Sequence, residues 1–74
     1  MLEVVSIDKY AVLMIYDYMD GTQPMYHVRL VIDKGEFHYD EALEYDYGSL
    51  EIAIFNGKKV YYSLINGGML DDIE

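Results

Sequence analysis

The stretch YAVLMIYDYM at residues 10–19 constrains the fold of this chain more than any other feature. Successive side chains of a β-strand point to opposite faces of its sheet, and here both faces are apolar as far as Tyr16. This pattern is typical of a central strand that is two-sided, whereas a strand with one solvated face alternates between apolar and polar residues. We therefore expect residues 10–19 to form an inner strand.

Two further runs read as strands. The run LEVVSI at residues 2–7 is rich in β-branched side chains, which favour strands. Residues 25–33 alternate, with His27 and Arg29 on one face. Turn residues separate the runs: Asp20-Gly21 begins a loop that Pro24 is expected to end, and Lys34-Gly35 marks the next turn. The apolar face of residues 25–33 consists of Tyr26, Val28, Leu30 and Ile32.

The dipeptide Asn56-Gly57 lies between two further apolar runs. Asn-Gly is the favoured sequence of a two-residue type I′ turn, because both positions require positive φ. The sequence therefore predicts a C-terminal β-hairpin over residues 50–65, followed by an acidic tail at residues 69–74. In this hairpin the paired apolar side chains would be Leu50, Ile52 and Ile54 on one strand and Val60, Tyr62 and Leu64 on the other.

Residues 36–47, EFHYDEALEYDY, allow two interpretations. As a strand, they place tyrosines on one face and most of the acids on the other. As a helix over about residues 40–47, Asp40 would be the N-cap and Gly48 the C′ residue. Each interpretation leaves one acid on the apolar face, so periodicity does not decide between them. The start and stop signals favour the short helix.

Together these elements predict a single α+β domain over residues 1–68. It would be a mostly antiparallel sheet of four to five strands, with one short helix at about residues 40–47 before the C-terminal hairpin. The alternative is an all-β meander or small barrel. The chain has 74 residues and no cysteine, so its core holds the fold without disulfides or shares that role with a second subunit.

Fourteen acidic residues against five basic ones give a net charge of −9. This balance argues against direct binding to nucleic acid or to an anionic membrane, and it suits a protein partner with a basic surface. Residues 36–47 hold five carboxylates and three tyrosines but no lysine or arginine to neutralise them. We therefore expect partner binding there, through Glu36, Tyr39, Asp40, Glu41, Glu44, Tyr45, Asp46 and Tyr47.

Catalysis and metal binding are not indicated by the sequence. Two histidines, three serines and one threonine show no spacing typical of a nucleophile with its base. His38 with Asp40 is expected to lie on a solvated strand edge. Asp17 and Asp20 lack the spacing of a calcium-binding loop. We expect no enzyme activity, no cofactor and no metal, and the absence of a signal-type segment leads us to expect a cytoplasmic protein.

In size, acidity and lack of cysteine the chain resembles small phage-encoded inhibitors of host defence, such as anti-CRISPR and anti-restriction proteins that mimic the charge of DNA. The resemblance implies a non-catalytic protein that blocks the basic nucleic-acid-binding surface of an enzyme. The alternative is a self-assembling structural or regulatory β-rich subunit, for example a homodimer, in which the acids serve only solubility.

Overall fold

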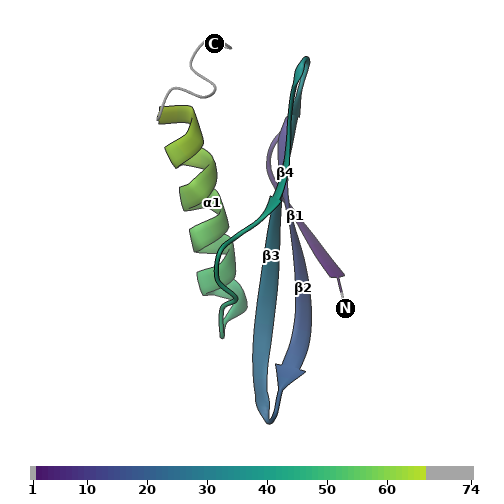
Figure 1. Ribbon diagram of the computed structural model, residues 1–74, viewed down its shortest axis with the longest axis vertical. Coiled ribbons are helices and arrows are strands. Elements are labelled where there is room, and N and C mark those ends of the chain that lie inside the picture. The colour runs from purple at the N-terminus through teal and green to yellow at the C-terminus, as the bar shows by residue number, and fades with distance from the viewer. Residues whose placement is uncertain (1, 67–74) are drawn as a thin grey trace.

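Each strand of the sheet pairs with the next one along the chain. The computed structural model describes residues 2–66, in which four antiparallel strands lie in the order β1-β2-β3-β4 and one helix covers one face of the sheet (Figure 1). The predicted α+β architecture is confirmed, with the helix last in the chain. The elements are β1 (Leu2–Asp8), β2 (Ala11–Asp20), β3 (Gln23–Lys34), β4 (Phe37–Ala42) and α1 (Leu50–Asn66).

Strand β2 is an inner strand, as its two-sided sequence predicts, with β1 and β3 as neighbours. Residues directly opposite each other in an antiparallel pair share a face, so the register assigns every side chain to one of two faces. Leu13 lies opposite Leu30 on the face that α1 covers, and Val12 lies opposite Val31 on the other. We call this second face, which α1 does not cover, the open face.

Two glycines make the turns that the sequence predicts. Gly21 between β2 and β3 has a φ of 67°, and Gly35 between β3 and β4 has a φ of 64°, both in the left-handed region that favours glycine. The loop between β2 and β3 is shorter than expected, because Pro24 already belongs to β3, where it pairs with Met19 of β2. β4 runs alongside β3 only from Arg29 onward, so the missing N–H of Pro24 breaks no ladder with β4.

The predicted C-terminal hairpin is wrong, because residues 50–66 form α1. Ser49 caps the helix, with its Oγ accepting a hydrogen bond from the backbone N–H of Ile52 at 3.4 Å. Gly57 is needed for packing and not for a turn. A Cβ atom at this position would lie 2.6 Å from Cδ2 of Leu13, so the helix crosses β2 at a distance that only glycine allows.

The predicted short helix at residues 40–47 is also wrong. Residues up to Ala42 belong to β4, and residues 43–49 form a loop. This loop returns to β3, where Tyr47 and Tyr26 exchange two backbone hydrogen bonds of 2.7 and 2.9 Å. Pairing with β3 satisfies the backbone of this segment, whereas a two-turn helix would depend on tertiary packing to form at all.

The core lies between the sheet and α1. Tyr61 on the helix is 3% exposed, and its hydroxyl donates a 2.6 Å hydrogen bond to Asp8 Oδ2 at the end of β1. The helix of the described residues lacks the length and apolar character that a membrane span requires. The predicted acidic tail, residues 69–74, lies outside the described residues. The buried core residues are Ala11, Leu13, Ile15, Val28, Leu30, Ile32, Ala53 and Tyr61.

Candidate functional site

Strand β4 is an edge strand of the sheet, and loop 43–49 continues from it towards α1 (Figure 1). All eight predicted partner-binding residues lie in β4, in this loop or in the turn before β4. We call residues 36–47 the acidic edge. An edge strand presents backbone N–H and C=O groups to a partner, so charges placed along it meet whatever approaches the sheet from that side.

The carboxylates of the acidic edge do not lie in one row. Asp40 pairs with Val31 and shares the open face with it, whereas Glu41 pairs with Leu30 and lies on the helix side. Glu36 is exposed in the turn before β4, and Glu44 is exposed in the loop. Neither predicted arrangement on a single face is therefore correct, because the strand ends at Ala42 and the loop changes direction after it.

One expectation about this segment is wrong: Asp40 does have a cationic neighbour. Arg29 of β3 places its Nε 2.8 Å from Asp40 Oδ1, a contact between strands that sequence spacing does not reveal. His38 does not pair with Asp40 and instead lies 3.2 Å from Asp33 across the β3–β4 pair. Both contacts are solvent-exposed, so each contributes little to stability.

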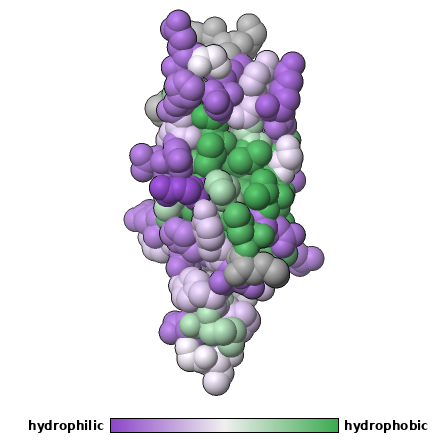
Figure 2. All heavy atoms as spheres, turned by 90° about the vertical axis from the view of Figure 1, so that its right-hand side faces the viewer, coloured by the Kyte–Doolittle hydropathy of each residue, from purple (hydrophilic) through white to green (hydrophobic). Residues whose placement is uncertain are grey.

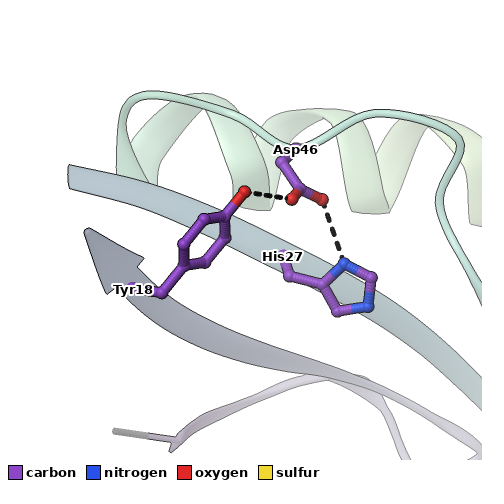
Figure 3. Close-up of polar contacts among 3 residues, drawn as sticks. All are labelled: Tyr18, His27 and Asp46. Atoms are coloured by element: carbon purple, nitrogen blue, oxygen red, sulfur yellow. Dashed lines mark hydrogen bonds and ion pairs between the residues drawn. The ribbon is translucent and has the colours of Figure 1, made fainter. Parts of the chain in front are cut away.

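Asp46 joins the loop to the sheet through two side chains, Tyr18 of β2 and His27 of β3 (Figure 3). The Tyr18 hydroxyl donates a 2.5 Å hydrogen bond to Asp46 Oδ2, and His27 Nδ1 lies 3.0 Å from Asp46 Oδ1. The hydrogen bond from Tyr18, and then that from His27, lowers the pKa of Asp46 below its ordinary value. Asp46 is thereby held as a carboxylate that fixes the loop against β2 and β3.

The contacts of Asp46 were not predictable from the sequence, because three separate segments supply the side chains. A histidine beside an aspartate is also the arrangement of a general base with its orienting group. Within residues 2–66, however, no serine or threonine hydroxyl forms a hydrogen bond with either histidine. The contacts of Asp46 hold loop 43–49 against β2 and β3.

The three tyrosines of the acidic edge border an open groove of about 400 Å³ between loop 43–49 and α1. Tyr39 and Tyr47 are half-buried and pack against the core, whereas Tyr45 is 64% exposed. Tyrosine supplies a large and rigid contact area, and exposed tyrosines are common anchors of protein interfaces. The groove also brings the cationic Lys59 of α1 close to this segment. The polar and aromatic lining of the groove includes Tyr39, Glu44, Tyr45, Tyr47, Lys59 and Ser63.

Among the described residues, no group of three or more histidine, aspartate or glutamate side chains is arranged to hold a metal ion. No family model, no curated protein and no solved structure matches this chain. The site is therefore interpreted from its own geometry.

Proposed function

We propose that this protein is a non-catalytic binding module that docks on the basic surface of another protein through its acidic edge. The observation that supports the proposal is that three glutamates of the acidic edge are exposed and unpaired. Glu36, Glu41 and Glu44 are exposed and have no ion-pair partner within residues 2–66. Glu36 lies just before the edge strand β4 and Glu41 lies near its end, while Glu44 lies next to the exposed Tyr45.

Unpaired carboxylates along an edge favour a cationic partner for a physical reason. Each exposed ion pair contributes little alone, because water and salt screen it. Several facing one basic surface attract it over a longer range, and they raise the association rate. Asp40 contributes less to this attraction, since Arg29 already neutralises part of its charge, and the Asp46 carboxylate is already engaged by Tyr18 and His27.

The specific form that we propose is an inhibitor that occupies the nucleic-acid-binding surface of an enzyme, acting in the cytoplasm. A surface that binds nucleic acid is rich in lysine and arginine, because it must neutralise phosphates. A protein with a net charge of −9 is attracted to such a surface. The self-assembling alternative differs in one testable respect: it assigns the glutamates of the acidic edge no role beyond solubility.

The test is displacement of labelled duplex DNA from purified DNA-cleaving enzymes, both restriction endonucleases and RNA-guided nucleases, at two salt concentrations. We expect the wild-type protein to displace DNA from at least one of them. The triple variant Glu36→Gln, Glu41→Gln, Glu44→Gln should bind that enzyme at least about tenfold more weakly at low salt, mainly through a slower association rate. The difference should shrink at high salt.

The matched control is the triple variant Glu3→Gln, Asp20→Asn, Glu51→Gln, which removes three exposed charges elsewhere in the protein. This control should retain most of the wild-type affinity, because a general loss of charge is not the same as loss of the binding edge. Equal binding by the wild type and the first triple variant at both salt concentrations would show that the acidic edge is only a solvated surface. Tyr45→Ala should increase the dissociation rate instead, as loss of an anchor does.

A further inference from the structure

The open face of the sheet carries an apolar patch that nothing in the described structure covers. Figure 2 shows it as a continuous hydrophobic area over the middle of the sheet. Leu2 is 45% exposed and Val4 is 57% exposed, although both lie in a strand. The register places five apolar side chains together in this patch: Leu2, Val4, Val12, Met14 and Val31.

The part of this face formed by β1, and by β2 as far as Tyr18, carries no charge, in a protein where charge is abundant. The rim of the face at β3 and β4 carries both signs, with Arg29 beside Asp40 and His38 beside Asp33. A large exposed patch of this kind marks an interaction surface more often than a solvated one. On β1, and on β2 as far as Tyr18, every residue on the open face is uncharged. These residues are Leu2, Val4, Ser6, Val12, Met14, Tyr16 and Tyr18.

The area of the face is sufficient for a pair of identical chains. Four strands about 4.8 Å apart, taken over about seven residues of about 3.4 Å each, cover a flat area of roughly 460 Å². The relief of the side chains adds to this flat area, so a pair would bury on the order of 1,000 Å², the size expected of a specific interface.

The charge distribution disfavours two other classes of occupant and permits an identical copy. A net charge of −9 repels nucleic acid and anionic membranes. It would repel a second copy as well, unless the surfaces that meet carry no charge, and the centre of the open face meets this condition. Two sheets with apolar faces pack face to face at about 10 Å, which would cover the outward side of β2 as α1 covers its inward side.

We propose that two copies of this chain form a dimer through their open faces, with Val4, Val12 and Met14 at the centre of the interface. The dimer has four layers, with the two sheets inside and the two helices outside. The proposal does not rest on the function of the acidic edge, because β4 lies at the rim of the interface.

Sedimentation equilibrium of the purified chain tests the dimer. We expect the wild type to have twice the 8.6 kDa mass of one chain at micromolar concentration. Val4→Glu should raise the dissociation constant at least about tenfold, because it places a charge in the centre of both faces. The matched control is Phe55→Glu on the outer side of α1, where the apolar side chain is 65% exposed. This control should leave the dimer intact.

A second variant separates pairing of faces from pairing of edges. β1 is also an edge strand, and two copies of it could join into one longer sheet. Val31 lies on β3, away from that edge. In the Val31→Lys variant the new ammonium group would lie next to Asp40, the residue opposite position 31 on β4. The fold should therefore tolerate the lysine, while a dimer formed through the open faces should dissociate.

Three results would overturn the proposal: a monomeric wild type throughout the micromolar range, a dimer that Val31→Lys leaves unchanged, or dissociation by Phe55→Glu but not by Val4→Glu. Circular dichroism of each variant shows whether it is folded. If Val4→Glu does not fold, the comparison of Val31→Lys with Phe55→Glu decides the question alone.

Discussion

The two faces of the sheet have similar residues and very different surroundings. On β2, Leu13 points to α1 and is buried, while Val12 and Met14 point the other way and remain partly exposed. Both sets of side chains are apolar, so hydrophobicity alone does not distinguish the face that packs against α1 from the open face. The difference comes from the position of one helix, which covers a single side (Figure 1).

The largest expected effect comes from emptying the covered face. Leu13→Ala should lower the free energy of unfolding by about 2–5 kcal/mol, the range for removing a buried leucine side chain and leaving a cavity. Val4→Ala on the open face should cost less than about 1 kcal/mol, since Val4 is 57% exposed. Urea unfolding of both variants measures the difference, at a protein concentration low enough to keep the chain monomeric.

Equal losses for Leu13→Ala and Val4→Ala would contradict the comparison of the two faces. They would mean that the open face is already buried in the folded chain. Repeating the unfolding at a high protein concentration sharpens the test. Val4→Ala should then cost more than at low concentration, because a dimer adds its own stability to the folded state.

The next largest effect concerns the close contact of α1 with β2. Alanine normally stabilises a helix by about 1 kcal/mol relative to glycine. Gly57→Ala should instead destabilise the protein by about 1–3 kcal/mol, because the added methyl group collides with the buried Leu13. Ser63→Ala on the exposed side of α1 is the control, and it should be neutral or slightly stabilising.

The double variant Leu13→Ala, Gly57→Ala should cost less than the sum of the two single variants. The methyl group at position 57 would occupy part of the space that the leucine leaves, so a coupling of at least about 1 kcal/mol is expected. Unfolding of the four proteins gives this coupling directly. Additive losses would mean that Gly57 and Leu13 do not compete for the same space.

Gly57 also shows why the C-terminal half was mispredicted. Asn56-Gly57 is a strong local turn signal, but the sheet requires a cover for Leu13 and its neighbours, and the helix supplies it. The sequence also holds two helical signals that the prediction of a hairpin left out of account. They are Ser49 as an N-cap, and a helical stripe formed by Leu50, Ala53, Ile54, Gly57, Val60, Tyr61 and Leu64.

The sheet was more predictable because its signals are local and agree with its environment. The two apolar faces of β2, the alternation in β3 and the turns at Gly21 and Gly35 follow from the sequence alone. The acidic character of residues 36–47 can be read from the sequence, but the geometry of the segment cannot. The contacts of Asp40 with Arg29 and of Asp46 with Tyr18 join separate segments, and no spacing rule reveals them.

A smaller effect is expected from the hydrogen bond between the helix and the β1–β2 hairpin. Tyr61→Phe should lower the free energy of unfolding by about 1–2 kcal/mol at neutral pH, because Asp8 loses a charge-assisted hydrogen bond. The matched control is Tyr62→Phe. Tyr62 is 51% exposed and its hydroxyl has no hydrogen-bond partner within residues 2–66, so this control should change little.

The pH dependence of the Tyr61→Phe effect gives a second measurement. Burial, and then the hydrogen bond to Asp8, raises the pKa of Tyr61 from 10.0 to about 12. The contribution of Tyr61 is therefore fully present below pH 10 and declines as the pH rises from about 10 to about 12, because the unfolded state loses its proton first. The stability difference between wild type and Tyr61→Phe should shrink over that range. A constant difference would mean that the hydroxyl is not protected in the folded state.

The smallest effect is expected from the rim between the open face and the acidic edge. Asp40→Asn should change the free energy of unfolding by less than about 0.5 kcal/mol, because the ion pair with Arg29 is solvent-exposed. Loss of this pair is also offset, since a chain with a net charge of −9 gains from losing one negative charge. Asp33→Asn, which removes the carboxylate near His38, is the control and should behave alike. Urea unfolding at low and high salt measures both variants, and their small effects should disappear at high salt. A decrease in the free energy of unfolding above about 1.5 kcal/mol for Asp40→Asn alone would show that Asp40 anchors β4. The acidic edge would then stabilise the fold, and it would not be a surface kept free for a partner.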